Sequence, residues 1–488
     1  MRFRNTLILA VVVALLGAYV VWVEKPAMER EEQESKLLDF DNAKVTGLSI
    51  ETAKGKVDLV RADPGGWTIT APRPMAADTV AVDGILDTIK SADVKKRLDE
   101  KPADLAPFGL DKPESTVVLT LAGGGSRKLA FGKKTPIGGS AYARRDDEPT
   151  VLLTADNVRA MMQRGGLDDL RDKSVVSFTD NDVKSVTISG VEGEPTVLTK
   201  DGNEWSVTAP LHAKADASQV RSLLASLRSL RATGFVDGVA TPPDAKYQLS
   251  PPRLTLELVL APDDTKKTLL IGGATEEPAK KEIYAQTLPG DTVYVVGSHL
   301  YSIAAKRAMD FRDKTVLALA KDKIRAVTSE RRDGAGFRLE KRDDTWSVAD
   351  AGTTGVKEFL LSRFVDDLRE LKGTDIASET GPRPEFGLDQ PAIKIVAEGA
   401  DGPLGTIRVN VVGEGADKKI YAAADGSQTV YLLQDFVFQR VDKKRSDFLL
   451  VPTPTPAAGA TAGTAAGADG DDDPEQPVAA GDEDGGGE

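Results

Sequence analysis

The sequence lacks cysteine altogether and has only two histidines, His212 and His299, among its 488 residues. Without cysteine there can be no disulfide bond, thiolate metal site, cysteine nucleophile or lipid-acceptor cysteine of a lipoprotein. Two histidines are too few to build a histidine-based zinc site within one domain. Thiol chemistry is therefore excluded, and a histidine zinc site is not expected.

A strongly basic region is also missing. The formal net charge is −13, but the last 38 residues hold nine acidic residues and no basic ones, so residues 1–450 carry only −4. Lys and Arg are interspersed with Asp and Glu in that part of the chain, and nothing resembles the basic stripe that a phosphate backbone requires. Nucleic acid is not an expected partner.

What the sequence does have is an internal repeat. Three tryptophans, Trp67, Trp205 and Trp346, follow turns and open strands, and they are spaced 138 and 141 residues apart. An apolar stripe with the i, i+3, i+4, i+7 spacing of one helix face recurs with the same offsets. Its copies are Val82-Ile85-Leu86-Ile89, Val220-Leu223-Leu224-Leu227 and Leu361-Phe364-Val365-Leu368. Copies of about 140 residues have the size of a domain, so we predict three tandem domains.

Two further motifs recur. Phe108-Gly109-Leu110-Asp111 returns as Phe386-Gly387-Leu388-Asp389, with a degenerate middle copy at Tyr247-Gln248-Leu249-Ser250. Because glycine permits positive φ and a proline follows, this motif predicts a turn. Arg171-Asp172-Lys173 returns as Arg312-Asp313-Lys314, and we take Arg445-Ser446-Asp447 as a looser third copy. These segments end each copy, which favours a domain junction held by charge pairs over a charged binding patch.

The strand and turn signals define the predicted fold. Alternating apolar residues are separated by connections too short for crossover helices, which indicates antiparallel pairing. We predict an α+β fold of three tandem repeats, each a mostly antiparallel sheet with one longer and one short helix, after an N-terminal transmembrane helix.

The first residues carry the export signal. Residues 6–23 are an uncharged apolar run preceded by Arg2 and Arg4, and about 27 Å of helix from such a run matches the hydrocarbon core of a bilayer. The positive-inside tendency places the N-terminus in the cytoplasm and the remainder outside. A cleaved signal peptide is the alternative. The predicted domains are 1–23 (transmembrane anchor), 24–39 (juxtamembrane linker), 40–177, 178–317 and 318–450 (repeats), and 451–488 (disordered acidic tail).

Several segments resemble functional sites, and each has a simpler structural interpretation. The tryptophans could form a ligand-stacking row, but their position after a turn favours core packing. Gly132-Lys133-Lys134-Thr135 resembles a phosphate loop, yet it has Arg127 in place of the leading glycine and lies between strands. Asp469, Asp471 and Asp473 resemble the start of a calcium loop, but Pro474 and Ala480 occupy its glycine and glutamate positions. His212 is expected in a surface loop, and His299 at the start of a short helix. We predict no catalytic, cofactor-binding or metal-binding residues, no cofactor, and no enzyme activity.

The apolar N-terminal segment, the Trp-initiated strand, the Phe108–Asp111 turn and the Arg171–Lys173 closure together resemble a bacterial family known as domain of unknown function 4340. The resemblance covers roughly residues 6–450. It implies a single-pass envelope protein of the inner membrane, with the bulk of the chain in the periplasm, working beside an ABC-type transport system.

The sequence thus favours a membrane-anchored, envelope-exposed scaffold or accessory protein with an envelope protein partner such as ABC transporter subunits. A protein that binds peptidoglycan or polysaccharide is the first alternative, and it requires an exposed aromatic row. An envelope hydrolase is the second, and it requires titratable groups that converge in one cleft.

Overall fold

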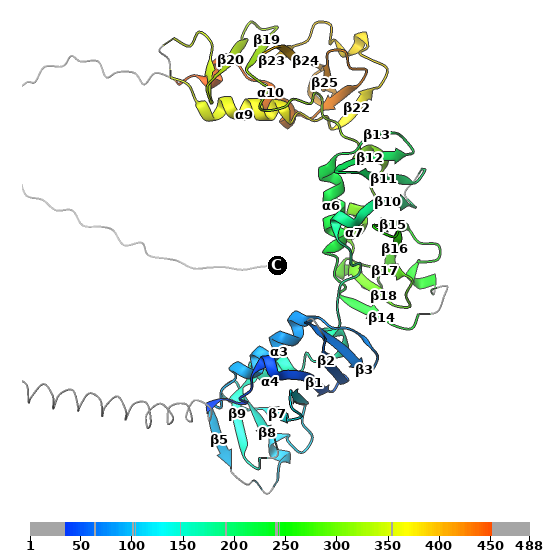
Figure 1. Ribbon diagram of the computed structural model, residues 1–488, viewed down its shortest axis with the longest axis vertical. Helices are drawn as coiled ribbons and strands as arrows, with labels where there is room; N and C mark the ends of the chain where they lie inside the picture. Colours follow the sequence, from blue (N-terminus) through cyan, green and yellow to red (C-terminus); the bar gives the residue numbers. More distant parts are fainter. Residues whose placement is uncertain are drawn as a thin grey trace, which may run out of the picture. The chain divides into compact units, whose positions relative to one another are not determined.

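The computed structural model describes residues 35–450, except 63–64, 100–101, 103, 147, 191–192, 240–242, 244 and 353–354 (Figure 1). The predicted anchor (1–23), most of the juxtamembrane linker and the acidic tail (451–488) lie outside the described residues. The chain divides into two compact units, one up to Asp313 and the other from Lys314. The first unit holds two repeats and the second holds one.

The first repeat is one antiparallel sheet with the strand order β4-β3-β2-β1-β6-β7-β8-β9-β5. Its strands are β1 (Val45–Thr52), β2 (Gly55–Arg61), β3 (Trp67–Ala71), β4 (Met75–Ala76), β5 (Lys96–Asp99), β6 (Ser115–Leu121), β7 (Ser126–Lys134), β8 (Ser140–Arg145) and β9 (Val151–Ala155). Its helices are α3 (Thr79–Ser91), α4 (Asp156–Met162) and α5 (Leu167–Leu170), with 3-10 turns η2 (Asn42–Lys44) and η3 (Ala106–Phe108).

The second repeat has the equivalent order, β13-β12-β11-β10-β15-β16-β17-β18-β14. Its strands are β10 (Val183–Ser189), β11 (Thr196–Asp201), β12 (Glu204–Ala209), β13 (Ala213–Lys214), β14 (Gly234–Val236), β15 (Leu254–Leu260), β16 (Thr265–Ala274), β17 (Glu282–Leu288) and β18 (Val293–Gly297). Its helices are α6 (Ala217–Arg228), α7 (His299–Ala304) and α8 (Ala308–Phe311), with η4 (Asp180–Asp182), η5 (Ala245–Tyr247) and η6 (Pro278–Lys280).

The third repeat has the order β21-β20-β19-β23-β24-β25-β26-β22 among its described residues. Its strands are β19 (Ala326–Arg331), β20 (Phe337–Arg342), β21 (Thr345–Val348), β22 (Asp375–Ser378), β23 (Ile393–Gly399), β24 (Gly402–Val412), β25 (Lys419–Ala424) and β26 (Val430–Leu433). Its helices are α9 (Glu358–Arg369) and α10 (Asp435–Val441), with η7 (Pro384–Phe386), η8 (Gly415–Asp417) and η9 (Arg445–Phe448).

The predicted α+β class is wrong in its balance of elements. Each repeat is dominated by a sheet of eight or nine strands and has few helices, so the described chain is mostly antiparallel sheet. The sequence pattern missed the two-residue strands β4 and β13 and the edge strands β5, β14 and β22, because such short segments carry no readable alternation. No helix in the described part of the chain is long and apolar enough to span a bilayer. The predicted spanning segment, residues 6–23, lies outside that part.

The long helix of each repeat buries the predicted stripe against one face of the sheet. Val82, Ile85, Leu86 and Ile89 of α3 are all buried, as are their counterparts on α6 and α9. Asp78 caps α3 by accepting from Ala81 N, and Asp216 caps α6 by accepting from Ser218 N. The tryptophans join the same cores and are only 3%, 8% and 8% exposed, so the core-packing interpretation is confirmed.

The Phe-Gly-Leu-Asp segment covers the opposite face of the sheet. Leu110 packs with Ala130 and Val151, whereas Phe131, the next residue along β7, points into the main core. Successive strand residues face opposite ways, so the sheet separates two apolar layers. The turn is as predicted, with left-handed backbone at Gly109 (φ 69°) and Gly387 (φ 61°). The degenerate middle copy keeps it as well, since Gln248 adopts φ 51°.

A tyrosine anchors this second layer in every repeat. Phe108 meets the ring of Tyr142 edge-on, with 5.1 Å between the centroids, and Tyr247 meets Tyr284 at 4.9 Å. In the third repeat Phe386 lies 4.6 Å from Tyr421. Each of these strand tyrosines is followed by an alanine that packs in the main core on the other face of the sheet: Ala143, Ala285 and Ala422.

The closing segment of each repeat returns to the start of its long helix. Ala77 pairs with Arg171, Ala215 with Arg312, and Val356 with Leu449. The third counterpart of Arg171 is therefore Leu449, and the sequence match to Arg445-Ser446-Asp447 is wrong by register. Those residues form η9, which corresponds to α8 of the second repeat: Asp447 accepts from Lys444 N at 2.8 Å, as Asp310 accepts from Arg307 N at 2.9 Å.

Candidate functional site

The junction between the first two repeats is built on Arg171. This side chain leaves the last segment of the first repeat and is only 6% exposed. Its guanidinium donates from Nη1 to Asp237 Oδ2 at 2.8 Å and from Nη2 to Asp237 Oδ1 at 3.1 Å, a two-bond geometry that fixes both partners. The same guanidinium lies over the ring of Phe235, 3.9 Å from its centroid. One residue of the first repeat is thus held by two of the second.

Asp237 receives a second set of donors. Thr292 Oγ1 donates to its Oδ1 at 3.0 Å, and Arg73 of the first repeat contacts the same oxygen. Burial raises the pKa of Asp237, but the hydrogen bonds from Arg171 and Thr292 outweigh it, so the pKa lies below its ordinary value. The carboxylate stays ionised at neutral pH and the pair remains charged.

The backbone continues the junction past Arg171. Lys173 O accepts from Ala232 N at 2.8 Å, and Ser174 pairs with Arg231. Asp172 forms an ion pair with Arg231 at 3.2 Å. Val175 and Val176 then pack in the core of the second repeat, ahead of the predicted boundary at residue 178. The predicted role of the Arg171–Lys173 segment as a junction held by charge pairs is confirmed here.

An open cleft of about 340 Å³ lies beside this junction. Its lining residues are Arg73, Pro74, Met75, Ala76, Arg171, Asp172, Ser174, Asp291, Thr292 and Tyr294. Arg73 and Asp291 approach to 3.9 Å across it, and Arg171 is already paired with Asp237 at 2.8 Å. The cleft therefore holds charges that are paired within the protein, which suits a structural joint better than an anion site.

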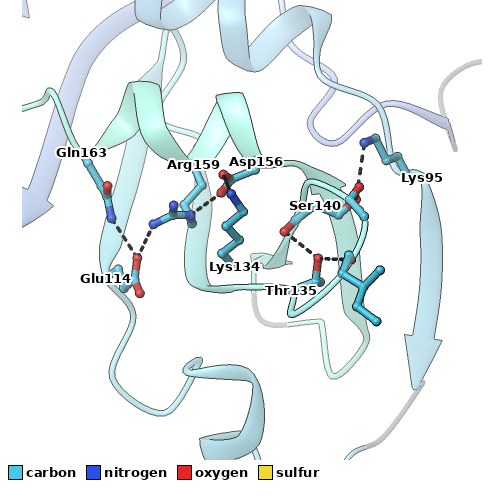
Figure 2. Close-up of polar contacts among 10 residues, drawn as sticks. Lys95, Glu114, Lys134, Thr135, Ser140, Asp156, Arg159 and Gln163 are labelled. Carbon is cyan, nitrogen blue, oxygen red and sulfur yellow. Dashed lines mark hydrogen bonds and ion pairs between the residues drawn. The ribbon is translucent and has the colours of Figure 1, made fainter. Parts of the chain in front are cut away.

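A second polar cluster lies in the first repeat (Figure 2). Glu114 Oε2 accepts from Arg159 Nη1 at 2.6 Å and from Gln163 Nε2 at 2.8 Å. Arg159 Nε donates to Asp156 Oδ1 at 2.7 Å, and Lys134 pairs with Asp156 at 3.2 Å. The chain of contacts ties α4 to the residue before β6 and to the end of β7.

The electrostatics of this cluster favour the charged forms of Asp156 and Arg159. The hydrogen bond from Arg159 lowers the pKa of Asp156, and the hydrogen bond to Asp156 raises the pKa of Arg159. An acid that donates a proton in catalysis needs the opposite shift. A hollow of about 490 Å³ opens beside Glu114, Arg159 and Gln163, with Thr52, Ala53 and Lys54 on its other side. The arrangement suits the anchoring of α4 and offers no free acid or base.

The segment Gly132–Thr135, which resembles a phosphate loop in sequence, lies beside the same cluster. Lys134 ends β7 and is engaged by Asp156, and Thr135 Oγ1 donates to the backbone carbonyl of Ile137 at 2.9 Å (Figure 2). Gly132 packs closely against the Phe108 carbonyl, so the space that a bound phosphate would need at this glycine is filled. The segment is a strand end, as its position between strands indicated.

The histidines lie apart from both clusters. His212 is exposed in the loop between β12 and β13, and His299 is the exposed first residue of α7, each as predicted. Among the described residues, no group of three or more His, Cys, Asp or Glu could hold a metal ion.

Sequence reasoning identified Arg171 but missed its partners. Phe235 and Asp237 lie on or beside β14, a three-residue edge strand, and no repeat motif marks them. Arg73 and Thr292 lie in loops that touch only when the second repeat is in place. Only one feature of the sequence pointed to these partners: an arginine at the end of a repeat, if buried, needs an acidic partner, and the next repeat is the place to look for it.

These features define a tandem-repeat protein with three antiparallel sheets, each covered on one face by a long helix and on the other by a turn with one residue in the left-handed conformation. The chain belongs to the family described as Domain of unknown function (DUF4340), whose model matches residues 67–249, 205–360 and 346–450. The three matches begin at Trp67, Trp205 and Trp346. No curated protein and no solved structure matches the chain.

Proposed function

We propose that this protein is an envelope-exposed scaffold or accessory protein that works beside an ABC-type transport system. It is attached to the inner membrane through the apolar residues 6–23, with its N-terminus in the cytoplasm and its repeats in the periplasm. In this role the repeats hold contact surfaces at set positions, and no bond is made or broken.

The junction at Arg171 is the observation that carries this proposal. A scaffold has to keep its surfaces at a fixed spacing. The two hydrogen bonds from the buried Arg171 to Asp237, together with the stacking on Phe235, supply directional contacts that resist rotation between the first two repeats. Inter-domain contacts without such bonds leave domains free to move.

The polymer-binding alternative has less support. It requires an exposed aromatic row shared by the repeats, and Trp67, Trp205 and Trp346 are buried in the three cores. The hydrolase alternative requires titratable groups that converge in one cleft. The charged groups at the junction cleft are paired with one another, and the pKa values of Asp156 and Asp237 are lowered, which does not suit a catalytic acid. Both observations are compatible with the scaffold proposal.

Crosslinking in intact cells followed by mass spectrometry tests the proposal. The full chain, carrying a C-terminal affinity tag, is expected to be recovered with permease or ATPase-associated subunits from the membrane fraction. Recovery with wall glycans alone would contradict it, and so would a chain found only in the soluble cytoplasmic fraction. A tagged, unrelated single-pass periplasmic protein is the control for non-specific recovery.

A further inference from the structure

The third repeat exposes large apolar side chains on its two helices, α9 and α10. Phe359 and Leu360 on α9 are 75% and 38% exposed, and Phe436 on α10 is 55% exposed. Leu360 and Phe436 line a groove of about 340 Å³ between the two helices. A buried apolar side chain contributes about 1.5–3 kcal/mol, so exposed ones of this size on a folded domain mark a surface that can bind a partner.

The first repeat has the same groove with a different lining. The buried stripes of α3 and α9 are 279 residues apart, as are the first residues of α4 and α10. The groove of the first repeat is lined by Thr88, Asn157, Ala160, Met161 and Arg164. Asn157 stands where the third repeat has Phe436, and Ala81 stands where it has Leu360. The fold alone therefore does not require apolar side chains at these positions.

The second repeat bridges the corresponding helices with a polar contact. Lys306, which follows α7, donates to Gln219 Oε1 on α6 at 2.7 Å. Gln219 corresponds to Leu360, 141 residues later. The three repeats thus share one scaffold, and only the third combines aromatic and aliphatic exposure at this place.

The charges around the groove of the third repeat are mainly positive. Arg363 and Arg440 are 59% and 48% exposed, and Lys443 also lines the groove. Asp367 forms ion pairs with Arg363 at 3.3 Å and with Arg440 at 4.0 Å, but it is only 12% exposed, so one enclosed carboxylate is shared by two exposed arginines. Asp447, the other carboxylate, accepts from Lys444 N as a helix cap. The accessible surface combines apolar side chains with guanidinium groups.

We propose that the groove between α9 and α10 binds an amphipathic segment of a partner protein, whose large apolar side chains are flanked by Asp or Glu. The apolar side chains would pack on Leu360 and Phe436, and the carboxylates would pair with Arg363 and Arg440. This inference rests on the proposed function, because it identifies the surface through which the scaffold holds its partner.

The chain's own C-terminal residues fit this groove less well. Residues 451–488 supply nine acidic residues, but their only large apolar side chains are Val451 and Val478. Such a segment can satisfy the arginines and cannot cover two exposed phenylalanines. The charge and the apolar area together favour a separate partner.

Photocrosslinking in cells, with the full chain, tests the proposal. A benzoylphenylalanine replaces Phe436, and a matched chain carries it at Asn157, the same position in the groove of the first repeat. We expect at least fivefold more adduct at position 436, mapped onto a segment with apolar residues at helical spacing and neighbouring Asp or Glu. The double variant Arg363→Glu/Arg440→Glu should reduce this adduct about tenfold or more. The control Arg342→Glu/Lys419→Glu makes the same charge change elsewhere on the third repeat and should leave it unchanged.

Each other outcome overturns the proposal. These outcomes are adducts to residues 451–488, adducts to a second copy of this chain, equal adducts at positions 157 and 436, and equal loss with both charge variants. Trp346 fluorescence, recorded in chains whose other three tryptophans are replaced by Phe, establishes that the third repeat of each variant is folded. Affinity recovery of transporter subunits by the wild-type chain reports the proposed function separately. Recovery of transporter subunits without an adduct at position 436 would contradict the groove proposal and leave the proposed function standing. An adduct to an acidic amphipathic segment of a protein unrelated to transport would contradict the transport role and leave the groove proposal standing.

Discussion

The side-chain amide of Asn410 donates a hydrogen bond to the backbone carbonyl of Phe386 at 3.0 Å, inside the third repeat. The first two repeats have Gly132 and Gly272 at this position. A Cβ at either glycine would lie 2.2 and 2.1 Å from the carbonyl oxygens of Phe108 and Tyr247. The equivalent backbone carbonyl of the turn is therefore accommodated in two ways. In the first two repeats a glycine leaves room for it, and in the third the Asn410 side chain donates a hydrogen bond to it. Both solutions keep the turn pressed against its sheet.

Replacement of Gly132 by Ala should destabilise the first repeat by about 1–3 kcal/mol, because the added methyl group overlaps the Phe108 carbonyl. Gly125→Ala is the control, since its nearest neighbour would be Leu121 Cδ1 at 4.0 Å and its effect should stay within about 0.5 kcal/mol. Hydrogen exchange of the β6 and β7 amides measures both. Equal effects of the two substitutions would contradict the close contact.

Loss of Arg171 should open the segment between the first two repeats. Arg171→Ala leaves Asp237 without its two-bond partner and Phe235 without its cation, so trypsin should cleave after Lys173 about tenfold faster or more. Asp237→Ala should give a similar rate, and the double variant should add little because the two residues act as one contact.

The exposed pair Lys214–Glu204, with side chains 62% and 74% exposed, is the control for this experiment. Lys214→Ala should leave cleavage after Lys173 unchanged, since exposed ion pairs contribute at most about 1 kcal/mol. A wild-type rate in the Arg171→Ala chain would show that the joint depends on other contacts.

Acid should weaken the cluster around Asp156. Because Arg159 lowers the pKa of Asp156 below its ordinary value of 3.8, the folded state holds this proton less tightly than the unfolded state. The resulting stabilisation is complete above pH 3.8 and is lost as the pH falls through the lower pKa of the folded state. Urea midpoints taken from about pH 5 to pH 2 should therefore fall more steeply for the wild type than for Asp156→Asn. Arg159→Met should remove that difference, and unchanged slopes in all three chains would contradict the assignment.

The tryptophans should report burial rather than ligand binding. Trp67 packs in the first core and donates from Nε1 to Asp83 at 2.9 Å, and Trp205 and Trp346 are also buried. In a Trp22→Phe chain, acrylamide should quench the remaining fluorescence weakly, and peptidoglycan fragments should not shift the emission. Strong quenching that such fragments relieve would restore the polymer-binding alternative.

The sequence predicted the repeated features because each recurs with its own physical reason. The stripe Val82–Ile89, the tryptophans and the Phe108–Asp111 turn were all placed correctly from spacing, burial and the need for positive φ. The register error at Arg445 arose because the alignment was based on charged residues and not on an apolar one. Leu170, Phe311 and Phe448 are the equivalent residues, since the backbone carbonyl of each accepts a hydrogen bond from the residue that precedes the long helix. Asp237 could not be found from the sequence, because a lone acid beside a three-residue strand has no periodicity.

The contact between Arg171 and Asp237 should hold the first two repeats at a fixed spacing, as the proposed scaffold role requires. Because the chain has no cysteine, spin labels can be placed cleanly on the equivalent hairpins with Ser126→Cys and Thr265→Cys. Pulsed electron resonance should give one narrow distance distribution, which broadens in the Arg171→Ala/Asp237→Ala background. A wild-type distribution as broad as that of the double variant would contradict the claim.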